Sequence, residues 1–171
     1  MSLVTDLSNS LAIVFRENVE ASDPERVRSI VTSSGFFSSQ EVEVAVELVE
    51  EALKRGAAIS GYHFLFAERA DRLIGYACFG PIACTEGSYD IYWIAVHNDF
   101  RGSGLGKELL KRSEELIQER GGRRLYVETS SREQYRPTHH FYKSCSYRIE
   151  AVLEQFYSPQ DDKIIYVKVL H

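Results

Sequence analysis

The sequence lacks a long apolar run, an excess of basic residues and paired cysteines, and each absence excludes a class of protein. Its apolar runs are far shorter than the about 20 residues that a membrane-spanning helix needs. The formal net charge is −5 at pH 7, whereas a nucleic-acid-binding domain is usually basic. We therefore expect neither a membrane nor a nucleic acid among its partners.

Cysteine is scarce as well, since the chain has only Cys78, Cys84 and Cys145 and no CxxC pair. An odd number of cysteines without such spacing favours reduced thiols and a cytoplasmic protein. The same spacing offers no zinc site, so we expect no metal. The first ten residues lack the basic segment and apolar core of a secretory signal.

What is present fits one globular domain. The chain has 171 residues, of which 44% are hydrophobic and 26% charged, so it is long enough for a full hydrophobic core. No internal repeat, low-complexity segment or linker divides it. We expect a single domain over residues 1–171.

Two capping-box spacings predict two helices in the first third of the chain. Ser22 is followed three residues later by Glu25, and Ser38 is followed in the same way by Glu41. Apolar residues then recur at helical spacing, and a glycine follows each stretch. We expect each helix to end at that glycine.

Runs of β-branched, aromatic and alternating apolar residues predict the strands. These runs lie at residues 11–15, 62–68, 73–79, 90–96, 124–129, 147–156 and 164–170. An amphipathic helix at residues 104–120 separates two of the strands, so those two are expected to be parallel neighbours with a right-handed crossover. With a short helix at 137–144, the order predicts a mixed α/β (α+β) fold. Its sheet is mainly antiparallel, with six to seven strands, one parallel pair and about four flanking helices.

A glycine-rich turn, RGSGLGK, stands directly before the long helix. A Walker A loop would need glycine in place of Arg101 and serine or threonine in place of Glu108. A GxGxxG dinucleotide fingerprint fails too, because Lys107 or Leu109 stands at its third glycine position. The first N–H groups of a helix are unpaired and partly positive, and glycines let an anion approach them. The turn therefore predicts a phosphate site, and a plain strand-to-helix corner is the alternative.

Three stretches resemble the GNAT superfamily of N-acetyltransferases. Residues 101–106 (RGSGLG) resemble its R/Q-x-x-G-x-G/A signature, residues 92–96 (YWIAV) its fourth strand, and residues 141–147 (FYKSCSY) its FYxxxGF segment. The resemblance implies an N-acetyltransferase domain whose parallel strand pair splays apart. It also implies acetyl-CoA as the co-substrate, an amine as the acceptor, and no metal.

The same resemblance implies a set of residues for coenzyme A: the backbone of the fourth strand holds the pantetheine arm, and the turn holds the pyrophosphate. These residues are Ile94, Ala95, Val96, Arg101, Gly102, Ser103, Gly104, Leu105, Gly106 and Lys107. Tyr135 stands where many members have asparagine, so Ser130 or Thr138 is expected to supply its hydrogen bonds to the cofactor. Ser146 stands where the family has glycine, which predicts a turn of different shape.

The reaction needs a base for the acceptor amine, whose reference pKa is about 10.4, and a proton donor for the departing thiolate. The resemblance implies Tyr142 as the donor. Glu128 and Asp90 are the two candidates for the base, with a slight preference for Glu128. For each residue a purely structural role stays open: a core aromatic for Tyr142, and a solvated strand end for each carboxylate.

The function that the resemblance implies is transfer of an acetyl group to a primary amine of a small molecule or peptide, by direct attack in a ternary complex. A catalytically silent acyl-CoA-binding or sensor domain on the same fold is the alternative, and a different acyl donor or acceptor is a third. Monomer and homodimer both stay open.

Overall fold

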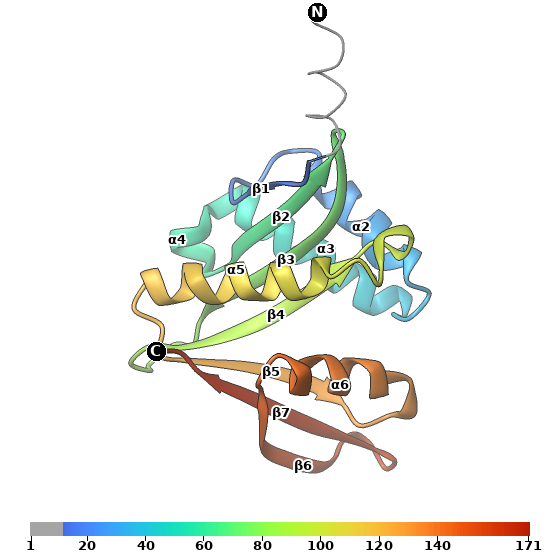
Figure 1. Ribbon diagram of the computed structural model, residues 1–171, viewed down its shortest axis with the longest axis vertical. Helices are drawn as coiled ribbons and strands as arrows, with labels where there is room; N and C mark the ends of the chain where they lie inside the picture. The colour runs from blue at the N-terminus through green and yellow to red at the C-terminus, as the bar shows by residue number, and fades with distance from the viewer. Residues whose placement is uncertain (1–11) are drawn as a thin grey trace, which may run out of the picture. The chain divides into compact units, whose positions relative to one another are not determined.

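The computed structural model describes residues 12–171, so the predicted strand at 11–15 begins at a residue outside the described part. Within that part, the α-helices are α2 (Asp23–Ser33), α3 (Ser39–Arg55), α4 (Ala57–Ser60), α5 (Leu105–Glu119) and α6 (Arg136–Ser144) (Figure 1). The strands are β1 (Val14–Arg16), β2 (His63–Arg69), β3 (Arg72–Pro81), β4 (Ser88–Val96), β5 (Arg124–Ser130), β6 (Arg148–Ser158) and β7 (Asp161–Val169). No helix among the described residues is long and apolar enough to cross a membrane.

The strands form a seven-stranded sheet in the order β1-β2-β3-β4-β5-β7-β6. β4 and β5 are parallel, and their pairing runs from Ser88 opposite Arg124 to Ile91 opposite Val127. The paired stretch stops there, although β4 continues for five more residues. The mixed α/β fold with one splayed parallel pair is therefore confirmed.

By its contacts, the chain forms two compact units, each made of two separate segments. Unit 1 comprises residues 1–78 and 93–111, and unit 2 comprises residues 79–92 and 112–171. The boundaries fall inside β3, β4 and α5.

The core of unit 1 is an aromatic and aliphatic cluster between α2, α3, β2 and β3. Phe64, Phe66 and Tyr76 stack on one another, with ring centroids 5.3 to 6.5 Å apart, and each is at most 2% exposed. Trp93 and Ala95 of β4 pack against this cluster. Burying one large apolar side chain stabilises a fold by about 1.5–3 kcal/mol, so this cluster fixes the second half of β4 in unit 1.

The two predicted capping boxes have different outcomes. Ser38 accepts a hydrogen bond from the Glu41 amide at 3.3 Å and donates its own amide to the Glu41 carboxylate at 2.8 Å, so the box at α3 is confirmed. The prediction for Ser22 is wrong, because its side chain makes no capping bond. Asp23, the first residue of the helix, instead accepts the amide of Glu20 at 2.7 Å, so its buried carboxylate fixes the chain that leads into α2.

Unit 2 contains a second aromatic cluster, below α6. Tyr142, Tyr147 and Tyr166 are each at most 3% exposed, and the Tyr142 ring lies 5.5 Å from Tyr147 and 5.8 Å from Tyr166. The Tyr147 hydroxyl donates to Glu114 at 2.9 Å, and Lys168 donates to the same carboxylate at 2.7 Å. These contacts hold α6 and the C-terminal half of α5 against β7.

The turn after α6 corrects the expectation for Ser146. This serine adopts a φ of +67°, the left-handed conformation that a glycine would take. The Tyr147 amide donates to the Tyr142 carbonyl at 3.0 Å and the Ser146 amide to the Lys143 carbonyl at 3.1 Å. The hydrogen bonds of the turn outweigh the strain at Ser146, so the shape is the one that glycine would give.

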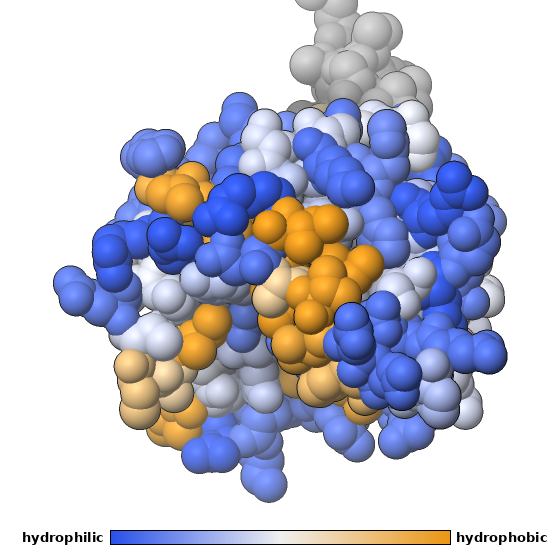
Figure 2. Space-filling view, turned by 90° about the horizontal axis from the view of Figure 1, so that it is seen from below, coloured by the Kyte–Doolittle hydropathy of each residue, from blue (hydrophilic) through white to orange (hydrophobic). Residues whose placement is uncertain are grey.

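β6 is an edge strand with almost every residue exposed. Figure 2, seen from below, shows apolar side chains gathered on the side where β6 lies in Figure 1. The large apolar side chains of β6 that are exposed are Ile149, Val152, Leu153, Phe156 and Tyr157.

Candidate functional site

The glycine-rich turn joins β4 to α5, as the sequence predicts. Gly102 has a φ of +74° and Gly104 a φ of +85°, and a Cβ added to either would meet no atom within 4 Å. Glycine is therefore required here by backbone conformation, since a side chain would not be excluded by packing. The space around both glycines is open, and α5 begins directly after them at Leu105.

The charged and polar residues of the turn face solvent. Arg101, Ser103 and Lys107 are exposed, and the Ser103 hydroxyl donates to the Phe100 carbonyl at 2.6 Å. The start of α5 thus combines the N–H groups of a first helical turn, a glycine turn of fixed conformation and the two cations Arg101 and Lys107. That combination can bind a diphosphate.

The predicted strand residues Ile94, Ala95 and Val96 are half-buried at the end of β4. Gly75 of β3, which the sequence analysis did not single out, lies against them. A Cβ on Gly75 would sit 3.2 Å from the Ala95 carbonyl oxygen and 3.0 Å from a methyl carbon of Leu109. An isolated glycine inside a strand is a signal of such close approach, and here it lets α5 pack directly on the sheet.

The two candidate bases lie on one face of the sheet in unit 2. Asp90 is opposite Tyr126 in the β4–β5 ladder, and Glu128 follows Tyr126 by two residues. Side chains two residues apart on a strand share a face, so both carboxylates are on the same side. The structure therefore places the two alternative candidates for the base, Asp90 and Glu128, on the same face of the sheet.

A lysine that sequence reasoning missed lies beside them. Lys163 is opposite Ser130 in the β5–β7 ladder, and its Nζ atom is 2.6 Å from Oε2 of Glu128. The ammonium group also lies 3.8 Å from the centroid of the Phe156 ring, within the range of a cation–π contact. Nothing in a lone lysine of a β-strand signals this partner, because the two residues are far apart in sequence.

These neighbours act unequally on the two carboxyl groups. Partial burial and then the negative charge of Glu128 raise the pKa of Asp90, Lys163 opposes both, and the net result is a rise from 3.8 to about 6. Glu128 is half exposed and ion-paired. The pKa of Asp90 is thus moved toward neutral pH, where a general base is effective.

Tyr142, the expected proton donor, lies on α6 with 3% of its side chain exposed. Burial raises its pKa above the ordinary value of 10, so the hydroxyl stays protonated at neutral pH. Its ring contacts Phe141, Tyr147 and Tyr166. The ring therefore packs as a core aromatic does, and a role of the hydroxyl in catalysis stays a prediction.

The expected substitutes for the family's asparagine differ in their surroundings. The Ser130 hydroxyl is buried and donates to Asp161, and it accepts the Arg132 amide at 3.2 Å. Thr138 is half-buried on α6, and the next residue, His139, is 2.9 Å through Nε2 from the Ser130 carbonyl oxygen. Their contacts with a cofactor stay predictions.

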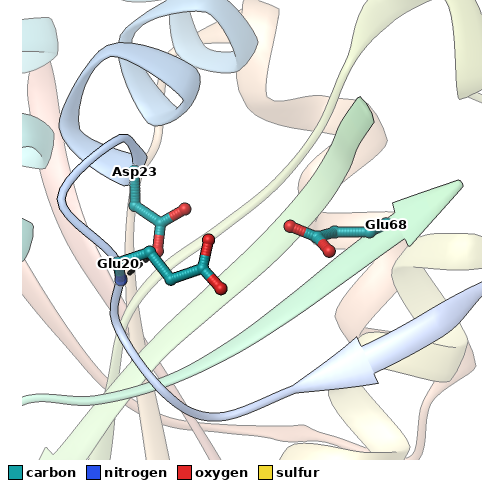
Figure 3. Close-up of side chains that lie close together, drawn as sticks. All are labelled: Glu20, Asp23 and Glu68. Carbon is teal, nitrogen blue, oxygen red and sulfur yellow. Dashed lines mark hydrogen bonds between the residues drawn. The ribbon is translucent and has the colours of Figure 1, made fainter. Parts of the chain in front are cut away.

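Glu20, Asp23 and Glu68 form an acidic cluster in unit 1 whose carboxylate oxygens lie within 4.8 Å of one another (Figure 3). Arg16 lies 2.6 Å from Asp23 and 2.8 Å from Glu68, and Arg26 lies 2.9 Å from Glu68. Two guanidinium groups thus balance two of the three charges. The cluster is an ion-pair network that ties β1 and β2 to the start of α2.

Unit 1 also has a surface groove of about 430 Å³ along α3. It is lined by Glu47, Leu48, Glu50, Glu51, Lys54 and Tyr62. Glu51 accepts a hydrogen bond from Arg55 at 2.8 Å, as expected for the solvated face of a helix.

Comparison with known families gives one match, to the acetyltransferase (GNAT) family, over residues 27–147. No curated protein matches the sequence. Among solved structures, the chain is similar to a protein of Desulfovibrio desulfuricans described as a GNAT-family acetyltransferase. The two are 48% identical with a TM-score of 0.91, over 94% of this chain and 100% of the other.

Two more distant structures share the fold. The ribosomal-protein-S18-alanine N-acetyltransferase of Escherichia coli is 17% identical with a TM-score of 0.72, over 93% of this chain and 94% of that one. An aminoglycoside 6′-N-acetyltransferase solved with coenzyme A is 17% identical with a TM-score of 0.73, over 94% of this chain and 98% of that one.

Proposed function

Because this chain belongs to the GNAT family of acetyltransferases, we propose that it transfers the acetyl group of acetyl-CoA to a primary amine, by direct attack in a ternary complex. Acetyl transfer follows from the family; the donor, the acceptor and the order of events are the proposal. The observation that carries it is the glycine turn at the start of α5, with two positive-φ glycines and open space around both.

The residues of this turn fit the pyrophosphate of coenzyme A. The amides of residues 102–107 supply partly positive donors, and Arg101 and Lys107 add formal charge. One structure with the same fold was solved with coenzyme A, which supports this ligand. The backbone of Ile94, Ala95 and Val96, beyond the end of the β4–β5 ladder, is proposed to pair with the pantetheine arm.

Asp90 is the proposed base for the acceptor amine. An amine attacks only when neutral, so a group must take its proton near neutral pH. The raised pKa of Asp90, about 6, supports it over Glu128, whose carboxylate is ion-paired with Lys163. We therefore prefer Asp90 as the base, in place of the slight preference for Glu128 in the sequence analysis, and assign Glu128 as a charged partner of Lys163.

Tyr142 is the proposed donor to the leaving sulfur. The thioester supplies the acetyl group, and its thiolate, with a pKa of about 8.5 for a cysteine-like thiol, leaves more easily when hydrogen-bonded. Burial holds the pKa of Tyr142 above that value, so a full proton transfer from it is uphill. Its larger effect is expected to be a hydrogen bond that strengthens as charge develops on sulfur.

The test is thiol release from acetyl-CoA by the purified protein, with a panel of polyamines, aminoglycosides, amino acids and peptides with free N-termini. Acetylation of at least one acceptor, with calorimetric binding of coenzyme A, is the expected result. Binding without thiol release by any amine would support the silent sensor domain instead. Absence of coenzyme A binding at millimolar concentration would overturn the proposal.

A further inference from the structure

Lys163 has an unusual position for a lysine on a sheet near the surface. Its side chain is only 13% exposed, its Nζ lies 2.6 Å from Glu128 and 3.8 Å from the Phe156 ring centroid, and the Tyr157 ring centroid lies 5.7 Å away. An exposed ion pair usually contributes little to stability and leaves both side chains mobile. A carboxylate and an aromatic ring together instead hold this ammonium group in one place.

The strand registers put this ammonium on the same face as Asp90. Lys163 is opposite Ser130, Glu128 lies two residues before Ser130, and Asp90 is opposite Tyr126, which lies two residues before Glu128. By the same alternation Arg124 shares this face, next to Ser88. The five β3 residues at 77–81 carry no charged side chain.

The apolar residues of β6 and β7 complete the face. Ala151 is opposite Ile165, and Leu153 is opposite Lys163. The charged and titratable groups that the ladders and strand alternation place on this face are Asp90, Tyr92, Arg124, Tyr126, Glu128, Arg148, Asp161 and Lys163. Of these, Asp161 is paired with Ser130 and Arg132, and Arg148 is ion-paired with Glu150. Glu128 is the carboxylate that Asp90 faces, and Lys163 is the cation paired with Glu128.

We propose that Lys163 is a positioning residue of the acetyl-transfer reaction: its ammonium group, fixed by Glu128 and Phe156, keeps Asp90 ionised and free to take the proton of the acceptor amine. The inference rests on the proposed role of Asp90 as the base. It adds a residue that acts through Asp90 and Glu128 without touching the reacting atoms.

The physical reason is the charge balance of the three groups. Two carboxylates side by side repel each other, and one of them then keeps its proton to a higher pH. The ammonium group of Lys163, paired with Glu128, offsets part of that repulsion. Without Lys163, Asp90 would hold a proton over more of the working pH range, and a protonated carboxyl group cannot accept another from the amine.

The experiment follows the titration of Asp90 and the acid limb of the pH–rate profile in three variants. Lys163→Met is expected to raise the midpoint of Asp90 by about one pH unit, which is about tenfold in proton affinity. Lys163→Arg keeps the charge and is expected to restore the midpoint. Glu128→Gln removes the repelling carboxylate, so it is expected to lower the midpoint. Midpoints are read from the carboxyl carbon signal of Asp90 by NMR, and kcat and KM are measured at each pH.

Lys168→Met is the matched control, because it removes a lysine of the same strand that is paired with Glu114. It is expected to leave the Asp90 midpoint unchanged. An unmoved midpoint in Lys163→Met, or equal shifts in Lys163→Met and Lys168→Met, would overturn the role of Lys163. The NMR titration needs no turnover, so the two proposals are tested separately. Absence of thiol release would contradict the proposed function. The titration midpoints would still show whether Lys163 shifts the pKa of Asp90. If Lys163→Met does not fold, the opposite shift expected in Glu128→Gln decides instead.

Discussion

Arg16 and Asp23 form a two-pronged ion pair, with N–O distances of 2.6 and 2.8 Å, around a carboxylate that is fully buried. The same guanidinium group contacts Glu68 at 2.8 Å. A buried carboxylate costs much free energy unless it is paired, so this contact is a condition for the start of α2 to lie where it does.

Arg16→Met should therefore lower the free energy of unfolding by about 3 kcal/mol, because it leaves the Asp23 carboxylate buried without its main partner. Urea unfolding followed by circular dichroism measures this. Arg28→Met is the matched control, since Arg28 pairs with the exposed Glu43 and should change stability little. Equal losses in the two variants would contradict the special role of the buried pair.

Gly104→Ala should weaken binding of coenzyme A about tenfold or more, because its φ of +85° strains any other residue and a methyl group would project into the open space of the turn. Isothermal titration calorimetry measures the dissociation constant. Gly35→Ala is the control: Gly35 has a φ of +62° with no neighbour within 4 Å, so it carries similar strain outside the turn. If both variants bound coenzyme A equally, the turn would not be the diphosphate site.

Tyr142→Phe should lower kcat about a hundredfold and leave the dissociation constant of coenzyme A nearly unchanged, because only the hydroxyl is removed. Tyr166→Phe removes a hydroxyl from a ring of the same buried cluster and has no proposed chemical role. Similar losses in both would mean that the Tyr142 hydroxyl serves packing, and unchanged turnover in Tyr142→Phe would remove it from the mechanism.

The rate should depend on pH with an acid limb near 6. Asp90 must be ionised to act as a base, and burial, then Glu128, raises its pKa to about 6, so kcat/KM falls as pH drops through that value. Asp90→Asn should abolish most activity and the limb with it. Asp71→Asn, in the exposed turn between β2 and β3, should leave the limb in place.

The same group predicts a stability effect of opposite sign. A carboxyl group whose pKa is raised by folding binds its proton more tightly in the folded state, so the folded protein is stabilised as pH falls through 6 and loses that stabilisation above it. Asp90→Asn should then raise the melting temperature at pH 7.5, where the wild-type group is charged. A lower melting temperature would mean that the ionised carboxylate stabilises the fold.

Ser146→Gly should stabilise the protein by about 0.5–1 kcal/mol, because glycine takes the φ of +67° without the side-chain strain of serine. Ser144→Gly, inside the last turn of α6, should do the reverse. Thermal unfolding measures both. A loss of stability in Ser146→Gly would show that the serine hydroxyl contributes more than the strain costs.

The sequence predicted those features that depend on neighbours along the chain. The α3 capping box joins residues three apart, and the glycine turn lies between a strand and a helix that periodicity locates. Lys163 could not be found in this way. Its contact with Glu128 exists because β7, the last strand, pairs between β5 and β6, and no local pattern encodes that insertion.

The prediction of a cap at Ser22 was wrong for a related reason. From the sequence alone, Ser22 and Glu25 have the spacing of a cap, and nothing marks Arg16 as the partner of the residue between them. The start of α2 is held by an ion pair between Asp23 and a guanidinium group brought from β1. Gly75 was visible in the sequence, but its meaning depends on how closely Leu109 approaches it.

The boundaries of the two compact units fall after Cys78, Tyr92 and Lys111, inside β3, β4 and α5. Each unit is therefore encoded by two separate stretches of the gene. A single crossover between related genes cannot exchange one unit whole, and a graft of the glycine turn must carry residues 93–111 together with residues 1–78. A chimaera joined at Gly104 would divide the 93–111 segment of unit 1 between two parents, so it is expected to fold less stably than one joined at a boundary of the units.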